Sequence, residues 1–130
     1  MEKPKILIIE DDENIKTQMK WALFQDYKVF FAVDGEKAME IMEHEHPPLV
    51  TLDLGLPPHP EDISTGMELL DWILQNEPAT KVIVVTGNPE RTAALQAISK
   101  GAHDFLTKPI DLEELRAILK RAYYVNTLET

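Results

Sequence analysis

The strongest constraint on the fold is a regular alternation of short apolar runs with helical patterns, repeated five times along the 130-residue chain. The first run, Lys5–Ile9, consists almost entirely of Ile and Leu, which is typical of a strand buried on both faces. Repeated strand–helix units connect with one handedness and give a parallel sheet with helices on both faces. We therefore predict one α/β domain with a doubly wound, five-stranded parallel sheet. Its strands are expected at about 5–9, 28–32, 49–52, 81–85 and 104–107.

Helix starts are marked by residues that accept hydrogen bonds from the first free backbone N–H groups. Asp12 and Asp111 each stand directly before a helical pattern and are predicted to be caps, and Asp34-Gly35 is predicted to open the second helix. Thr65 and Glu68 have the spacing of a capping box for the third helix. Each helix therefore begins soon after a strand ends, which places the connecting loops together at one edge of the sheet.

The charge is strongly acidic, with 23 Asp and Glu residues against 13 Lys and Arg and a net charge of −10. Such a surface repels a nucleic-acid backbone, so no direct nucleic-acid contact is expected, and it attracts hard divalent cations. The absence of Cys excludes disulfides and thiolate metal sites. No apolar run approaches the roughly 20 residues that span a bilayer, and the N-terminus does not have the pattern of a signal peptide. We expect a cytoplasmic location without membrane association.

Polar residues follow the predicted strands at their carboxyl ends, which is where parallel α/β sheets bind ligands. Glu10 and Asp11 follow the first strand, and Asp53 ends the third. Thr86 ends the fourth strand, and Lys108 comes directly after the fifth. Three carboxylates, one hydroxyl and one ammonium group are therefore expected at the same edge of the sheet.

This set of residues suits phosphoryl transfer. Clustered carboxylates repel one another unless a cation such as Mg²⁺ (or Mn²⁺) binds them. With the metal and Lys108 neutralising phosphoryl oxygens and Thr86 donating a hydrogen bond, Asp53 could act as the nucleophile and form an aspartyl phosphate. Gly87 would leave room for the phosphate and present its N–H. An Asp-nucleophile phosphatase is an alternative, but such enzymes usually have a second Asp where this chain has Gly55.

At these positions the sequence resembles the receiver domain of bacterial two-component response regulators, over the whole chain. The resemblance implies a CheY-like, flavodoxin-like sheet with strand order 2-1-3-4-5. It also implies that Asp53 receives a phosphoryl group from a sensor histidine kinase, and that the domain is a signalling phosphoacceptor rather than an enzyme beyond its own phosphotransfer and dephosphorylation. The motifs that carry it are Glu10-Asp11, Leu52-Asp53-Leu54, Thr86-Gly87 and Phe105 with Lys108-Pro109.

The resemblance assigns roles at the metal. Asp11 and Asp53 would bind Mg²⁺ directly, Glu10 would bind it through water, and Gly55 would supply a backbone carbonyl. Gly55 and Asn88 would also tune dephosphorylation, and Asn88 is independently predicted to cap the fourth helix, before Pro89.

The resemblance also assigns a switch. Thr86 would move toward the phosphoryl group, and Phe105 would turn inward in response. The surface formed by the fourth helix, the fifth strand and the fifth helix would then change, and with it homodimer formation or contact with an output domain. The Lys108–Pro109 bond is usually cis in such domains.

Two stretches, 51–58 and 84–88, resemble the receivers of NtrC-like activators of the PrsR type, which are associated with PEP-CTERM and exopolysaccharide gene clusters. This implies a receiver at 1–122 and, at 123–130, the start of a linker helix to an AAA+ ATPase and DNA-binding region outside this chain, for sigma-54-dependent transcription. A stand-alone receiver that acts by protein–protein binding is an alternative, as is a receiver that is never phosphorylated.

One feature departs from the family pattern. Most receivers have a Gly about eight residues after the acceptor, whereas Gly66 lies thirteen residues after Asp53. The sequence therefore predicts an insertion at about 58–64, in the loop after the third strand. Elsewhere, Trp21 and Trp72 are expected to be partly buried packing residues.

Overall fold

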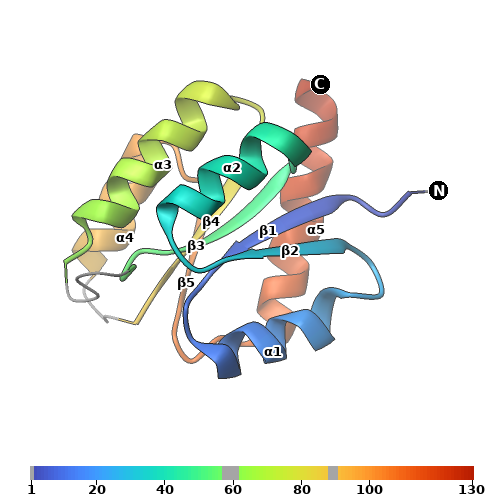
Figure 1. Ribbon diagram of the computed structural model, residues 1–130, viewed down its shortest axis with the longest axis horizontal. Coiled ribbons are helices and arrows are strands. Elements are labelled where there is room, and N and C mark those ends of the chain that lie inside the picture. Colours follow the sequence, from blue (N-terminus) through green and yellow to red (C-terminus); the bar gives the residue numbers. More distant parts are fainter. Residues whose placement is uncertain (1, 57–61, 88–90) are drawn as a thin grey trace.

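The computed structural model describes residues 2–56, 62–87 and 91–130, and it confirms the predicted sheet. All four neighbouring strand pairs are parallel, in the order β2-β1-β3-β4-β5 (Figure 1). The order reverses between β1 and β3, so the connections from these two strands leave toward opposite faces. The strands are β1 (Lys5–Ile9), β2 (Lys28–Ala32), β3 (Leu49–Asp53), β4 (Lys81–Thr86) and β5 (Asp104–Thr107).

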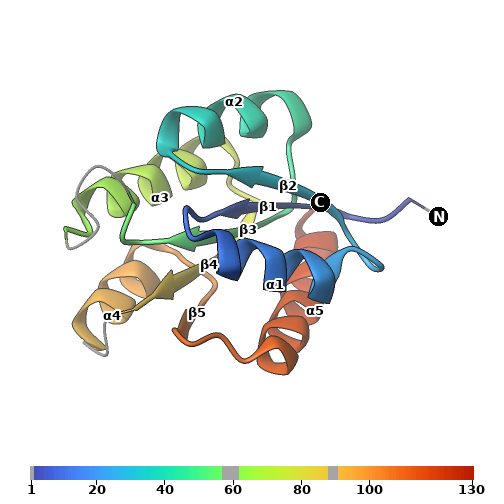
Figure 2. The same cartoon turned by 60° about the horizontal axis from the view of Figure 1, so that its bottom comes forward.

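Helices cover both faces of the sheet, as predicted. α1 and α5 pack on one face, and α2, α3 and α4 pack on the other (Figure 2). Residues 91–100 form α4, and Gly101, with a φ of +119°, ends it, a conformation that glycine adopts readily. The helices are α1 (Glu13–Leu23), α2 (Gly35–Glu45), α3 (Ser64–Asn76), α4 (Arg91–Lys100) and α5 (Leu112–Glu129).

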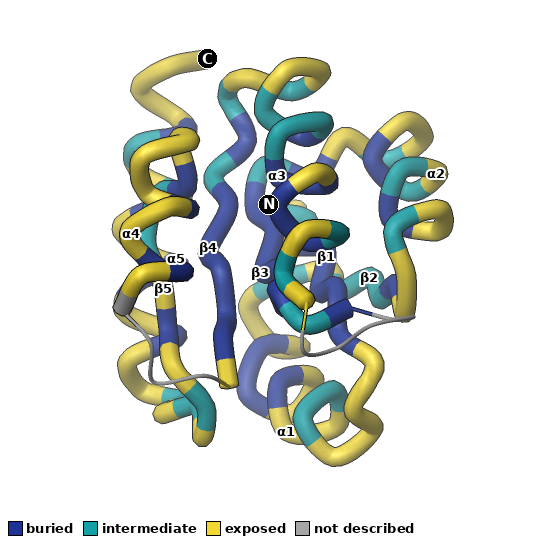
Figure 3. Tube along the Cα trace, turned by 90° about the vertical axis from the view of Figure 1, so that its left-hand side faces the viewer, coloured by how far each residue is buried: buried dark blue, intermediate teal, exposed yellow. Residues whose placement is uncertain are grey.

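The sheet separates two hydrophobic cores. Side chains along β1 alternate between them: Leu7 and Ile9 join the core beneath α2, α3 and α4, whereas Ile6 and Ile8 join the core beneath α1 and α5. This alternation follows from the two-residue period of a strand. Figure 3 shows the central strands as buried over most of their length and the helices as exposed on their outer sides. The buried strands hold their carboxyl ends in fixed positions.

The predicted caps Asp12 and Asp111 are confirmed, and the structure shows a third cap at Asp34. The side chain of Asp12 accepts from the N–H of Ile15 at 3.1 Å, and Asp34 accepts from Lys37 at 2.9 Å. Asp111 accepts from the second and third residues of α5. Each contact satisfies a backbone donor that the helix itself leaves free.

The predicted capping box of α3 is wrong. The helix begins at Ser64, so Thr65 lies inside it, and its cap residue Ile63 has no side-chain hydrogen bond. The carboxylate of Asp62 accepts from the N–H of Ser64 at 2.9 Å, whereas in the predicted capping box the side chain of Thr65 would accept from the N–H of Glu68. The predicted cap Asn88, Pro89 and most of the insertion at 58–64 lie outside the described residues.

The last helix is continuous and contacts the body of the domain through its final turns. Asn126 is buried, and its side-chain amide donates to the carbonyl of Ala79 at 2.9 Å. Glu129 forms an ion pair with Lys81, at the start of β4, at 2.7 Å. Within the described ranges, no helix has the length and apolar content needed to cross a bilayer.

The two tryptophans differ. Trp72 is partly buried against the core beneath α3, as expected. Trp21 is 66% exposed, so the prediction that it is a partly buried packing residue is wrong. It lies on the outer side of α1, away from the stripe of buried residues Met19, Ala22 and Leu23.

Candidate phosphorylation and metal site

Three carboxylates meet at the carboxyl ends of β1 and β3. Oxygens of Glu10, Asp11 and Asp53 all lie within 4.8 Å of one another. Glu10 and Asp53 are 2% and 5% exposed, whereas Asp11 faces solvent at the start of the loop to α1. Because β1 and β3 are adjacent parallel strands, residues that follow one strand necessarily approach the end of the other. The sequence prediction that these carboxylates converge is confirmed.

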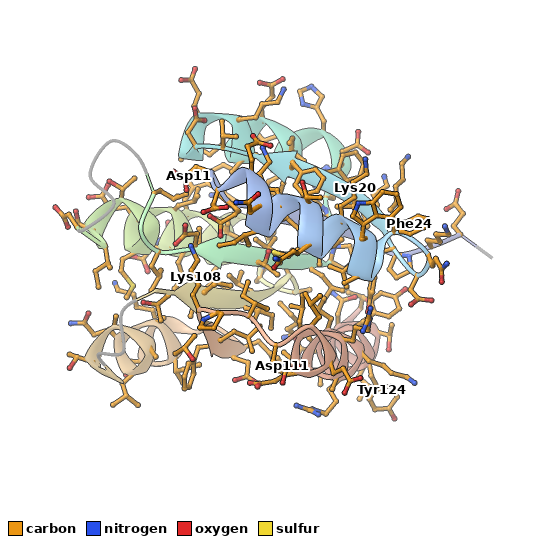
Figure 4. The ribbon with its side chains drawn as sticks, turned by 90° about the horizontal axis from the view of Figure 1, so that it is seen from below. Asp11, Lys20, Phe24, Lys108, Asp111 and Tyr124 are labelled. Atoms are coloured by element: carbon orange, nitrogen blue, oxygen red, sulfur yellow. The ribbon has the colours of Figure 1, made fainter. Side chains whose placement is uncertain are left out.

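Lys108 completes the cluster from the other side. Its Nζ lies 3.2 Å from Oδ2 of Asp53 and 3.3 Å from Oε1 of Glu10. The backbone N–H of Lys108 donates to the carbonyl of Thr86 at 2.9 Å, which holds the loop after β5 against the end of β4. The Lys108–Pro109 peptide bond is cis, as the resemblance implies. Figure 4 shows Asp11 and Lys108 at the same end of the molecule.

The protonation of the cluster reflects this crowding. Burial and, secondarily, the neighbouring Asp53 carboxylate raise the pKa of Glu10 to about 7. Burial on its own would lower the pKa of Lys108, but the charges of Asp53 and Glu10 outweigh it and raise that pKa. The single ammonium group therefore stays charged, and it compensates only part of the negative charge that the three carboxylates carry once Glu10 is also ionised.

The carboxylates retain unused acceptor capacity. Oδ1 of Asp53 accepts the backbone N–H of Gly55 at 2.9 Å, and Oε2 of Glu10 accepts the N–H of Asp12 at 3.2 Å. A carboxylate has about four lone-pair positions, so both groups can accept further ligands. Under-compensated oxygen ligands that are partly buried and partly open to water fit a small, hard divalent cation that keeps some of its waters.

The residues expected to contact a phosphoryl group surround Asp53. Thr86 ends β4 and is 3% exposed. Gly87 is exposed, and an added Cβ would lie 3.6 Å from Cδ of Lys108, which is an ordinary contact. The chain itself therefore leaves room for a side chain at Gly87, so a need for glycine there would have to come from a bound group.

Phe105 differs from what its sequence alone indicates. An aromatic residue within a strand is expected to join the core, but Phe105 is 37% exposed. It points outward because Leu106, the next residue of β5, takes the buried position. Phe105 pairs with Val84 in the sheet, two residues before Thr86.

Comparison with known proteins agrees with this geometry. The family model described as the response regulator receiver domain matches residues 6–120. This chain belongs to that family. The receiver has the fold and strand order that the resemblance implies, and its acidic cluster lies where receiver domains bind Mg²⁺.

Named relatives of the receiver include transcriptional regulators. It is 29% identical to the regulatory protein AtoC from Escherichia coli over 96% of this chain and 26% of AtoC. It is 36% identical to the transcriptional regulatory protein KdpE from Staphylococcus aureus, over 89% of this chain and 48% of KdpE. The crystal structure of NtrX from Brucella abortus in complex with ADP matches with a TM-score of 0.88 and 27% identity, over 98% of this chain and 28% of NtrX. The receiver thus spans between a quarter and a half of these proteins.

The structure adds one residue that sequence reasoning did not place in the site. Gly66, in the first turn of α3, packs against the backbone of Leu54: an added Cβ would lie 2.7 Å from the Leu54 carbonyl oxygen and 2.8 Å from its Cα. Leu54 stands between Asp53 and Gly55, and its side chain is fully buried. Gly66 therefore packs directly against the backbone that carries Asp53. The sequence held a signal for this contact, because most receivers have a Gly in the loop after the third strand. In this chain the insertion moves that Gly to position 66.

Proposed function

We propose that Asp53 accepts a phosphoryl group from the phosphohistidine of a sensor histidine kinase. A carboxylate oxygen of Asp53 attacks phosphorus, and the phosphorus–nitrogen bond breaks. The bonding electrons stay on the ring nitrogen, so an imidazole that is protonated on its other nitrogen leaves as neutral histidine. The observation that carries the proposal is the position of Asp53, which is nearly buried, contacts the ammonium of Lys108 and lies within 4.8 Å of two further carboxylates. Lys108 would remain beside the phosphoryl oxygens and stabilise their charge.

Asp11, Asp53 and the carbonyl of Gly55 would hold Mg²⁺ (or Mn²⁺), with Glu10 bound through water. When bound, the metal supplies positive charge to the transferring phosphoryl group. The excess of carboxylates over cations supports this assignment. The hydroxyl of Thr86 and the N–H of Gly87 would donate to phosphoryl oxygens. Gly55 would also tune hydrolysis of the aspartyl phosphate, as would Asn88, which lies outside the described residues.

The switch would act through Thr86 and Phe105 on the surface formed by α4, β5 and α5. Two exposed apolar side chains on α4, Leu95 and Ile98, support an interaction role for this surface, because they stand 64% and 39% exposed. Phosphorylation would change homodimer formation or output contact there. We propose an NtrC-like, PrsR-type regulator, cytoplasmic, in which 123–130 begins the linker to AAA+ ATPase and DNA-binding regions. The lengths of AtoC and NtrX support further domains.

The acceptor is tested by incubating the protein with acetyl phosphate and MgCl₂ and separating the products on a phosphate-affinity gel. We expect a retarded band that disappears in Asp53→Asn and requires Mg²⁺. Asp11→Asn should abolish the Mg²⁺ dependence together with the band. A band that persists in Asp53→Asn would assign the phosphate to another residue.

A further inference from the structure

The surface at the amino ends of the strands, opposite the acidic cluster, has an unusual composition. It contains two hollows that share Tyr27 in their walls. One, of about 510 Å³, lies between the loop after α1 and the middle of α5, and the other, of about 460 Å³, lies beside the starts of β1 and β2. We call these together the amino-end hollow. It is lined mainly by Tyr27, Tyr123, Lys3, Lys28, Arg116 and Lys120.

An exposed aromatic pair lies close to this hollow, where the carbonyl of Phe24 accepts a hydrogen bond from Lys3 in the hollow's wall. Trp21 and Phe24 form an edge-to-face pair with ring centroids 5.4 Å apart, and they are 66% and 40% exposed. Phe24 follows directly on α1, and Tyr27 comes three residues later. Figure 4 shows Phe24 and Lys20 at the end of α1 that lies away from Asp11 and Lys108. Exposed large aromatic residues next to a concavity are typical of binding surfaces.

The charge of the hollow is opposite to that of the whole protein. Lys3, Lys28, Arg116 and Lys120 line it, and among the described residues none of them forms an ion pair. Lys5 also lines it but pairs with Glu45. The carboxylates in the walls are Glu2 and Asp26.

Part of this basic charge has an internal explanation. Lys3 donates to the carbonyl of Phe24 and Arg116 donates to the carbonyl of Ala22, so both satisfy the carboxyl end of α1. Lys28 lies over the ring of Phe30. These contacts use one donor of Lys3 and one of Arg116, and the ammonium of Lys120 forms no hydrogen bond or ion pair with the residues that the structure describes. A local excess of cations therefore persists on a chain with a net charge of −10.

We propose that the amino-end hollow binds an acidic peptide segment of a partner protein. Carboxylates of the segment would face Lys28, Arg116 and Lys120, and a large apolar side chain would pack against Tyr27 and Tyr123. A membrane surface or a nucleic-acid backbone fits less well, because either would extend beyond the hollow and meet the acidic remainder of the surface. A peptide is narrow enough to contact the hollow alone. This site lies at the opposite end of the sheet from Asp53 and does not depend on phosphorylation there.

The test uses a synthetic helical peptide of about 15 residues, which spans roughly 22 Å, with Glu on one face and Leu and Phe on the other. Amide ¹⁵N–¹H spectra of the protein are recorded during titration. We expect the peptide to shift signals from 20–28 and 116–124 and to leave those of 53–55 unchanged. The same peptide with Gln in place of every Glu should bind at least about tenfold more weakly, because charge attraction is lost. Added salt should also weaken binding.

Two double variants that change the net charge by the same amount test whether binding depends on the lysines of the hollow. Lys28→Glu with Lys120→Glu should weaken binding of the acidic peptide about tenfold. Lys37→Glu with Lys100→Glu changes the net charge equally but lies on α2 and α4, and should leave the affinity unchanged. Phosphorylation at Asp53 by acetyl phosphate, measured on the same variants, is expected to persist. Loss of phosphorylation and loss of peptide binding are therefore distinguishable.

Several outcomes would overturn the proposal. No shifts at the hollow with about 1 mM peptide would do so, as would equal binding of the Gln peptide or equal weakening by both double variants. Tighter binding to phosphatidylserine vesicles or to duplex DNA, lost in Lys28→Glu with Lys120→Glu, would assign the hollow to a membrane or to nucleic acid. A concentration-dependent dimer in sedimentation, abolished by the same variant, would assign it to a second copy of this chain.

Discussion

A substitution at Gly66 is the sharpest test of how the fold positions Asp53. In Gly66→Ala the new methyl would meet the carbonyl oxygen and Cα of Leu54 at 2.7 and 2.8 Å. These are backbone atoms, and the Leu54 side chain beyond them is fully buried, so they cannot turn aside as the end of a flexible side chain can. Ordinary contact requires α3 and the segment after β3 to separate by about half an ångström or more.

The expected cost follows from two opposing effects. Overpacking a buried contact typically destabilises by about 1–3 kcal/mol. Replacing Gly by Ala within a helix stabilises the folded state by about 1 kcal/mol, because Ala has the higher helix propensity. Because the clash is with backbone atoms, the overpacking cost should lie in the upper part of its range, at about 2–3 kcal/mol. The net loss should then be about 1–2 kcal/mol, which lowers the melting temperature by roughly 4–10 °C in a domain of this size. The same separation would pull the N–H of Gly55 away from Oδ1 of Asp53, now at 2.9 Å, and would weaken Mg²⁺ binding.

The assay is thermal unfolding at increasing MgCl₂, because a ligand of the folded state raises the melting temperature by mass action. Gly35→Ala is the matched glycine control, since its Cβ would meet only Leu69 Cδ2, at 3.9 Å. Ile73→Val, in the core beneath the same helix, should lose about 1 kcal/mol without changing the response to Mg²⁺. If Gly66→Ala matches wild type in both melting temperature and Mg²⁺ response, the steric argument is refuted.

Three further expectations follow from the site and from α5. The raised pKa of Glu10, about 7, means that without metal the folded protein holds a proton that the unfolded chain releases near pH 4.5, so stability should fall as pH rises between these values. Urea unfolding in EDTA at about pH 5 and about pH 8 should show this fall, and Glu10→Gln should reduce it. Lys108→Met should keep the metal site but slow phosphorylation at Asp53 by a factor of about 100 or more in acetyl phosphate kinetics; an unchanged rate would remove Lys108 from the chemistry. Asn126→Ala should lose about 1–2 kcal/mol in urea unfolding, because the carbonyl of Ala79 loses its donor.

The fold was largely predictable because the short apolar runs and the capping residues agree with each other. The sequence ranges 28–32 and 104–107 match β2 and β5 at both ends. Convergence of Glu10, Asp53 and Lys108 was also predictable, since parallel strands bring all their carboxyl ends to one edge. Adjacency in the sheet then determines the contacts, and local sequence is sufficient to locate each residue on its strand.

Other features depend on packing between segments that are distant in sequence. The start of α3 was misplaced because Thr65 and Glu68 satisfy a local pattern, whereas Asp62 satisfies the backbone instead. The contact of Gly66 with Leu54 appears only when the chain after the insertion returns to β3. The exposure of Trp21 could not be inferred from composition, because large aromatic residues are usually buried to a considerable extent.

The division of the interior by the sheet has a consequence for how the protein can vary. Leu7 and Ile8 are neighbours in β1 but contact different cores, so the energetic effects of substitutions on the two faces should be nearly additive. At the edge of the sheet that carries Asp53, loops to helices on both faces meet. Natural variation could therefore repack the side of α1 and α5, and reshape the surface above it, while the packing beneath α3 and α4 stays the same.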